Sequence, residues 1–175
     1  MKILFLLLVL LIAGCNDTQT NSPILTEDKI LVKSEDTVMV RIRNFTITGD
    51  KLRFDIDCKL ASATPFIMGS STFVLNATNL INPVLTNINP KYTIGGGNGY
   101  YQMLTSNYDN KLSVQIIYLN SPGSFVSNDF ERIATVTMDI VSNDLSVGWN
   151  TQYTTVINPI YKKANIMFAE SLKIK

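Results

Sequence analysis

The 175-residue chain contains no histidine and only two cysteines, Cys15 and Cys58. The absence of histidine excludes Ser-His and Cys-His nucleophilic catalysis, histidine-ligated zinc and the usual proton carrier at neutral pH. If Cys15 is used by the N-terminal segment considered below, Cys58 has no partner and no internal disulfide supports the fold. Cys58 occupies the same every-second position as Phe54, Ile56 and Leu60, which predicts a buried and unreactive thiol. The chain therefore lacks the side chains of several common enzyme mechanisms.

Charge is also scarce and nearly balanced. Charged residues make up 17% of the chain, and the formal net charge is +1. Removal of Lys2 with an N-terminal signal would leave 14 basic and 14 acidic residues. A net charge of zero provides no electrostatic footprint for nucleic acid, and it predicts no polybasic attraction to anionic lipid. We expect no nucleic-acid partner and no cofactor.

Only one long apolar run is present, at residues 3–13, directly after Met1 and Lys2. It is too short to span a bilayer, which requires about 20 apolar residues, and its basic start is typical of a signal peptide. The run ends in Leu-Ile-Ala-Gly-Cys at residues 11–15, which resembles the bacterial lipobox. The resemblance implies cleavage before Cys15 and acylation of that residue, a durable membrane anchor. An ordinary secreted protein with an incidental Cys15 is the alternative.

The next segment, Asn-Asp-Thr-Gln-Thr-Asn-Ser at residues 16–22, has no large apolar side chain. Such a composition predicts a flexible leash. We therefore expect a signal peptide at residues 1–14, a lipid-anchored leash and lead-in at 15–37, and one folded domain at 38–175. The anchor predicts a location in the bacterial cell envelope, in the outer membrane rather than the inner one, with the domain outside the cytoplasm. Asp36-Thr37-Val38 also resembles a short O-glycosylation motif, which makes Thr37 a possible acceptor.

Most of the remaining chain is predicted to form short strands. Residues 51–60 alternate strictly between apolar and charged side chains, as expected for a half-buried antiparallel strand. Residues 38–48 alternate too, with a change of phase near Asn44 that predicts a β-bulge, and residues 48–51 predict a hairpin turn. Asn82-Pro83 and Asn89-Pro90 are interpreted as turns. Further strands are expected at 71–76, 100–105, 111–119, 132–141 and 145–150, with 165–175 at a sheet edge. This pattern predicts an all-β fold, an antiparallel β-sandwich or a barrel.

Several motifs carry a family resemblance: FDID at 54–57, MGSSTFVLN at 68–76, LINP at 80–83, IATVTM at 133–138 and LSVGW at 145–149. Together they resemble the cohesin-like and carbohydrate-binding-like β-sandwich modules of surface proteins from Bacteroidetes-type bacteria. The resemblance covers residues 38–158. It implies a jelly-roll sandwich of about nine strands, without catalysis, used in adhesion or assembly, with Trp149 in the core. Cohesins proper belong to multi-module scaffolds, whereas this chain carries one module, and no dockerin-contacting residue can be matched.

Tyrosines supply the candidate ligand-binding residues: Tyr100, Tyr101, Tyr108 and Tyr118. Exposed tyrosines can stack on sugar rings and form hydrogen bonds with their edges. This interpretation requires at least two of the four to be exposed and coplanar. The alternative is that alternate tyrosines pack in the core while the others lie singly on the surface.

Other candidate sites favour structural interpretations. Asp55 and Asp57 share one strand face and could act as the paired carboxylates of a glycosidase, but their alternation with basic residues favours an ordinary solvated face. Four acids could offer oxygen ligands to calcium, although their spacing matches no known loop, and no metal is expected: Asp129, Glu131, Asp139 and Asp144. The glycines at 95–99 lack the Lys and the following helix of a phosphate-binding loop, so an inter-strand loop is favoured.

Taken together, the sequence predicts a non-catalytic envelope lipoprotein whose sandwich binds a protein partner in adhesion or surface assembly. An exposed apolar patch on one sheet face would distinguish this function. The alternative is a carbohydrate-binding lipoprotein that uses exposed tyrosines, with polysaccharide as its partner. A hydrolase relying only on Asp and Glu ranks third, and a purely structural envelope protein stays open.

Overall fold

The computed structural model describes residues 36–95, 100–169 and 172–174. Contacts within the chain group Ser34–Lys175 into one unit. The predicted signal peptide, Cys15 and the predicted leash lie outside the described residues, so these predictions remain untested. No helix in the described ranges is long and apolar enough to cross a membrane.

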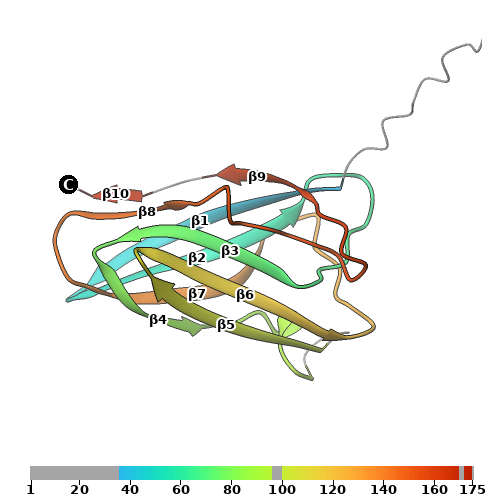
Figure 1. Cartoon of the computed structure of the whole chain (residues 1–175), viewed down its shortest axis with the longest axis horizontal. Coiled ribbons are helices and arrows are strands. Elements are labelled where there is room, and N and C mark those ends of the chain that lie inside the picture. Colours follow the sequence, from blue (N-terminus) through green and yellow to red (C-terminus); the bar gives the residue numbers. More distant parts are fainter. Residues whose placement is uncertain (1–35, 96–99, 170–171, 175) are drawn as a thin grey trace, which may run out of the picture. The chain divides into compact units, whose positions relative to one another are not determined.

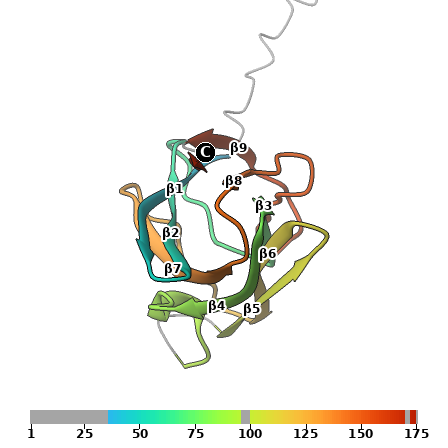
Figure 2. The same ribbon diagram turned by 90° about the vertical axis from the view of Figure 1, so that its left-hand side faces the viewer.

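Two five-stranded sheets face each other in this unit (Figures 1 and 2). The described strands are β1 (Thr37–Thr48), β2 (Lys51–Leu60), β3 (Ser71–Thr78), β4 (Leu80–Thr86), β5 (Tyr100–Tyr108), β6 (Lys111–Asn120), β7 (Glu131–Ile140), β8 (Leu145–Trp149), β9 (Asn165–Ala169) and β10 (Leu172–Ile174). The β2 sheet has the order β4-β7-β2-β1-β9, and the β3 sheet has the order β10-β8-β3-β6-β5. Neighbouring strands are antiparallel except β1 and β9, which are parallel. The predicted all-β sandwich is confirmed.

The hairpin of β1 and β2 follows the sequence prediction closely. Thr48 pairs with Lys51 across the turn, and the register shifts between Arg43 and Thr46, where Asn44 has a φ of 55°. The predicted bulge is therefore present. The apolar positions of β2 are buried between the sheets, and Cys58 among them is fully buried and unpaired. Burial raises the pKa of the Cys58 thiol far above its ordinary value, as predicted for an inert cysteine.

Strand β4 was missed because Asn82-Pro83 was interpreted as a turn. Proline cannot donate to a sheet ladder and is tolerated on edge strands and at bulges. Both conditions hold here, since β4 is the edge of the β2 sheet and its register with β7 shifts between Ile81 and Val84. Asn89-Pro90 does mark a turn, because Asn89 caps the short 3-10 helix η1 (Pro90–Tyr92).

The core lies between the two sheets and is apolar. Its largest fully buried side chains are Tyr92, Tyr101, Phe54, Phe66, Phe73, Ile42, Leu52, Ile56, Met68, Leu75, Leu80 and Leu112. Burial of each large apolar side chain contributes about 1.5–3 kcal/mol. Trp149, predicted in the core, lies partly buried at its margin, with ring centroids 6.5 Å from Phe73 and 5.5 Å from Phe168. Its Nε1 donates to the carbonyl of Ala169 at 3.1 Å.

Candidate functional site

Tyr101 is fully buried and holds together two long connections at one end of the sandwich. Its hydroxyl donates to the carbonyl of Met68 at 2.7 Å and accepts from the backbone N–H of Ser124 at 2.7 Å. These two residues belong to the β2–β3 and β6–β7 connections, which also pair directly through Met68 N–H and Ser124 O at 3.0 Å. Burial raises the pKa of Tyr101. Because no face of its ring is exposed, Tyr101 has a structural role.

The other three candidate tyrosines do not converge. Tyr118 is partly buried, with its ring centroid 5.5 Å from that of Tyr101. Tyr100 and Tyr108 are 50% and 84% exposed, but they lie at opposite ends of β5. Eight residues of strand separate them by roughly 27 Å, at about 3.4 Å per residue. The structure therefore leaves two exposed tyrosines that are too far apart to stack on one sugar ring.

The outward face of the β3 sheet is almost uncharged along β3, β5 and β6. Its side chains on these strands include Thr72 and Asn76 on β3, Gln102, Leu104, Ser106 and Tyr108 on β5, and Lys111, Ser113, Gln115 and Ile117 on β6. Lys111 is the one charged residue in this set, and its Nζ lies 3.5 Å from Asp109. Leu104 is 43% exposed, and the half-exposed ring of Tyr153 lies 5.9 Å from Lys111 Nζ. We call this surface the uncharged face.

The outward face of the β2 sheet is, in contrast, densely charged. In the register of β1, β2 and β7, Arg41 and Arg132 flank Asp57, and Arg43 and Thr135 flank Asp55. Arg53 and Lys59 extend the same face of β2 in both directions. Arg41, Arg43, Arg53, Lys59 and Arg132 together form what we call the cationic cluster.

The prediction that Asp55 and Asp57 lie on a solvated face is wrong. Asp57 is fully buried and Asp55 is 5% exposed. Asp57 Oδ2 accepts from Arg41 Nε at 3.0 Å and also forms an ion pair with Arg43. The Arg41 guanidinium in turn lies 3.7 Å from the ring centroid of Phe130, which covers it from above. Side chains from neighbouring strands thus cover both carboxylates, an effect that alternation along β2 alone cannot reveal.

Asp55 is held as a carboxylate by its neighbours. Burial by itself would raise its pKa, but hydrogen bonds from Thr135 at 2.6 Å and Asn44 at 2.8 Å outweigh burial, and nearby Arg132 and Arg53 add to them. The pKa of Asp55 is therefore below its ordinary value. A carboxylate with a lowered pKa is unsuited to act as a general acid, which requires a raised one.

Two of the four acids considered for calcium are bound to other side chains. Glu131 binds Lys91 at 2.8 Å and the hydroxyl of Tyr92 at 3.2 Å. Asp139 binds Lys51 at 2.5 Å and Asn82 at 2.9 Å. Within residues 36–95, 100–169 and 172–174, no three metal-binding side chains gather in one place. Residues 96–99 of the glycine-rich segment lie outside the described residues, and Thr37 begins β1.

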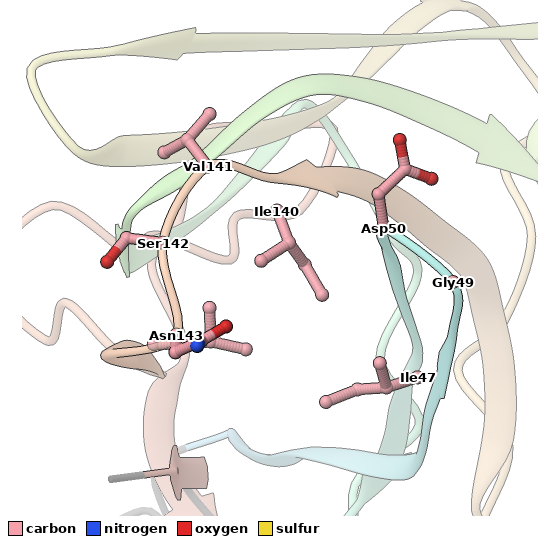
Figure 3. Close-up of a pocket in the computed structure, with 8 residues that line it drawn as sticks. Ile47, Gly49, Asp50, Ile140, Val141, Ser142 and Asn143 are labelled. Carbon is pink, nitrogen blue, oxygen red and sulfur yellow. The ribbon is translucent and has the colours of Figure 1, made fainter.

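An open pocket of about 500 Å³ lies where the β1–β2 turn meets the β7–β8 connection (Figure 3). Its walls are Ile47, Gly49, Asp50, Ile140, Val141, Ser142, Asn143 and Leu145. Asp50 is the single ionisable side chain among them, so the pocket holds no nucleophile with a base and no pair of carboxylates. Its chemistry does not support a catalytic site.

The class of protein that these features define is an antiparallel β-sandwich with broad, exposed sheet faces. No protein-family model matches the chain, and no curated protein matches it. Solved cohesin modules share its fold. A non-cellulosomal cohesin from Archaeoglobus fulgidus is 9% identical, with a TM-score of 0.51 over 81% of this chain and 92% of that one.

Two bacterial structures give the same result. A cohesin–dockerin complex from Clostridium thermocellum matches with a TM-score of 0.55 and 11% identity, over 81% of this chain and 96% of that one. A cohesin module of a family 33 glycoside hydrolase from Clostridium perfringens matches with a TM-score of 0.52 and 9% identity, over the same two shares. The chain therefore has a cohesin-like fold.

Proposed function

We propose that this protein is a non-catalytic lipoprotein of the bacterial cell envelope whose sandwich binds a protein partner in adhesion or surface assembly. The uncharged face is the observation that carries this proposal. Protein interfaces are depleted of charge at their centre and enriched in aromatic residues. Leu104, Tyr108 and Tyr153 supply exposed apolar groups on or beside that face, with uncharged polar side chains between them.

The fold comparison supports the same proposal. The Clostridium thermocellum structure shows a cohesin in complex with a dockerin, so this sandwich architecture can present a protein-binding surface. Aliphatic and aromatic side chains that become fully desolvated contribute most of the affinity in such interfaces. The partner of this chain is then a protein whose own contact surface is low in charge.

The membrane anchor is the second part of the proposal. Acylation of Cys15 would hold the sandwich at the outer membrane, outside the cytoplasm, with residues 16–36 between the anchor and β1. A Cys15→Ala variant should either lose its partition into detergent or accumulate unprocessed. If the variant behaves as the unmodified chain does in both respects, Cys15 is not the anchor.

The binding function is tested by a pull-down with the chain from Asn16 to Lys175, using envelope extract of the source organism. The captured protein is identified, purified and titrated against two variants of matched chemistry. Leu104→Glu places a charge on the uncharged face, whereas Val84→Glu places one on the opposite sheet, where Val84 is also exposed. We expect Leu104→Glu to weaken binding at least tenfold, about 1.4 kcal/mol, and Val84→Glu to leave it unchanged. Equal effects of both variants would contradict the assignment of this face.

The requirement of two coplanar exposed tyrosines is not met, so the second candidate, carbohydrate binding, is restricted to an extended polysaccharide that contacts the exposed Tyr100 and Tyr108 separately. Each pull-down eluate is challenged with free polysaccharide, and Tyr100→Ala and Tyr108→Ala are compared in glycan retention. Competition by sugar, together with loss of retention in these variants, would favour a glycan ligand. Capture that ignores sugar would favour the protein partner.

A further inference from the structure

The charge of this chain is separated in space although its sum is close to zero. One face of the β2 sheet carries the five basic side chains of the cationic cluster and Lys51, against Asp55, Asp57 and Asp139, which leaves three net positive charges. The uncharged face on the other sheet carries Lys111 paired with Asp109. One side of the sandwich therefore presents a net positive field that the net charge of the sequence conceals.

Two of the three acidic groups of this face lie beneath the basic ones, and the third, Asp139, is paired with Lys51. Both Asp55 oxygens accept hydrogen bonds, from Thr135 and Asn44, and Asp57 is fully buried under Arg41 and Arg43. Neither carboxylate is exposed enough to contact an approaching cation. An external ligand meets the basic groups first.

Several of the basic groups have unused donors. Arg43 approaches Asp57 through Nε, and no described residue accepts from its terminal nitrogens. Arg53 and Arg132 are exposed and form no ion pair with any residue in the described ranges. Guanidinium groups with free terminal nitrogens bind phosphate oxygens through paired hydrogen bonds. The cluster therefore has the chemistry of a phosphate-binding surface.

The position of the cluster suits a broad ligand rather than a small one. β2 is the middle strand of its sheet, and Figure 2 shows β1, β2 and β7 forming one side of the sandwich. No residue of the cluster lines the pocket of Figure 3 or the smaller pocket of about 320 Å³ beside Phe125. A ligand of these side chains is therefore bound outside both pockets, as another surface resting on the sheet face would be.

The segment between Cys15 and β1 limits how far the sandwich can lie from a membrane that holds Cys15. β1, which carries Arg41 and Arg43, begins at Thr37. The 22 residues from Cys15 to Asp36 reach at most about 75 Å, whatever their conformation, since an extended residue spans about 3.4 Å. A lipid on Cys15 would therefore keep the start of β1 within about 75 Å of a bilayer surface, so the domain would meet that surface repeatedly.

We propose that the cationic cluster rests on the phosphate-bearing headgroups of an anionic bilayer, the one to which Cys15 anchors the chain. This inference rests on the proposed lipid anchor. The uncharged face, on the other sheet, then points away from the bilayer toward a protein partner. Each cationic side chain near an anionic surface increases binding by about fivefold, so three net charges give roughly a hundredfold. Such an attraction binds a free domain only weakly and reversibly, but it is sufficient to orient a tethered one.

The test uses the unlipidated chain from Cys15 to Lys175, whose hydrophobic core lies entirely within the folded unit. Cys58 is fully buried, so Cys15 is the reactive thiol for coupling to a maleimide lipid. The chain is coupled to vesicles of phosphatidylcholine, alone or mixed with phosphatidylglycerol, and its lysines are acetylated. We expect Lys51 and Lys59, on the same sheet face as the cationic cluster, to be protected on the mixed vesicles relative to Lys111 on the uncharged face. Protection should disappear at high salt.

The variant Arg53→Glu/Arg132→Glu should abolish this protection. It should also reduce flotation of the uncoupled chain with mixed vesicles by at least 25-fold, about fivefold for each charge removed. Lys111→Glu, on the uncharged face, is the matched control for Arg53→Glu alone, with the same change in net charge. Protection of Lys51 and Lys59 is measured in it relative to vesicles of phosphatidylcholine alone, and both readouts should be unchanged. Arg53→Gln/Arg132→Gln, a milder pair, replaces the reversal variant if that one unfolds.

Uniform acetylation of the lysines on both vesicle types, or equal effects of Arg53→Glu and Lys111→Glu, would overturn the proposal. Binding to soluble polyglutamate without binding to vesicles would also overturn it and assign the cluster to an acidic protein segment. Because coupling is chemical, this result does not depend on lipidation in the cell. Failure of the anchor in the Cys15→Ala experiment is therefore distinguishable from failure of the cationic cluster.

Discussion

Replacement of Tyr101 by phenylalanine separates the structural role of this residue from the ligand-binding role that its sequence neighbourhood suggested. The change removes one oxygen and keeps the ring, so contacts with Tyr92 and Tyr118, both at 5.5 Å between centroids, are retained. The Met68 carbonyl and the Ser124 N–H then lose their partner. Both residues are buried, at 0% and 4% exposure, so water cannot readily replace the hydroxyl.

The expected cost follows from these two groups. A buried polar group that loses its hydrogen bond costs about 1–3 kcal/mol, which gives roughly 2–6 kcal/mol for the pair. In a domain of this size each kcal/mol lowers the Tm by about 2–4 °C, so a central cost of about 4 kcal/mol predicts a decrease of roughly 8–16 °C. Urea denaturation and calorimetry measure the two quantities independently.

Tyr108→Phe is the matched control, because Tyr108 lies on the same strand and its side chain is 84% exposed. Its effect should stay within about 0.5 kcal/mol. The reasoning is refuted if Tyr101→Phe costs less than about 1 kcal/mol, or if the control costs as much. A normal stability for Tyr101→Phe together with loss of ligand binding would return Tyr101 to the candidate site.

Three further predictions concern single residues. The folded-state pKa of Asp55 lies below its ordinary value of 3.8. Its contribution to stability is therefore present above that pH and is lost as the pH falls through the lower, folded value. The free energy of unfolding of Asp55→Asn should vary less with pH in the acid range, and an unchanged pH dependence would contradict this. Gly69→Ala should destabilise the domain by about 1–3 kcal/mol, because a Cβ there would lie 2.5 Å from the carbonyl carbon of Asn158. An unchanged urea midpoint would show that the Ile157–Asn158 backbone can move away. Cys58 should resist a thiol reagent in the native state and react after denaturation, because its thiol is buried with a raised pKa. Rapid labelling of Cys58 in the folded protein would contradict its burial between the sheets.

The strands of this protein could be predicted because their signal is local. Side chains alternate between the two faces of a strand, so the period-2 pattern of residues 51–60 predicted both β2 and the burial of Cys58. The bulge near Asn44 was also visible, as a change of phase. β4 was not, because Pro83 is compatible with a strand only at an edge or a bulge, and the position of a strand within a sheet depends on the other strands.

The candidate site was much less predictable. Asp55 and Asp57 alternate with basic residues, as solvated side chains do, yet Arg41 and Arg43 from β1 and Thr135 from β7 cover them. Of the four candidate tyrosines, Tyr101 is buried and two others lie at opposite ends of β5. In both cases the result depends on residues that are distant in the sequence and adjacent in the sheet.

The sequence by itself determined the all-β architecture, the inert thiol and the absence of histidine chemistry, because these depend on composition and on periodicity within short segments. Only the tertiary structure decided which charges are buried, which tyrosines are exposed and how the two outward faces differ. The physical reason is that net charge and alternation are unaffected by how strands are paired. Strand pairing places five basic side chains together on the outward face of β1, β2 and β7, whereas Lys111 is the one charged residue among the outward positions named for β3, β5 and β6.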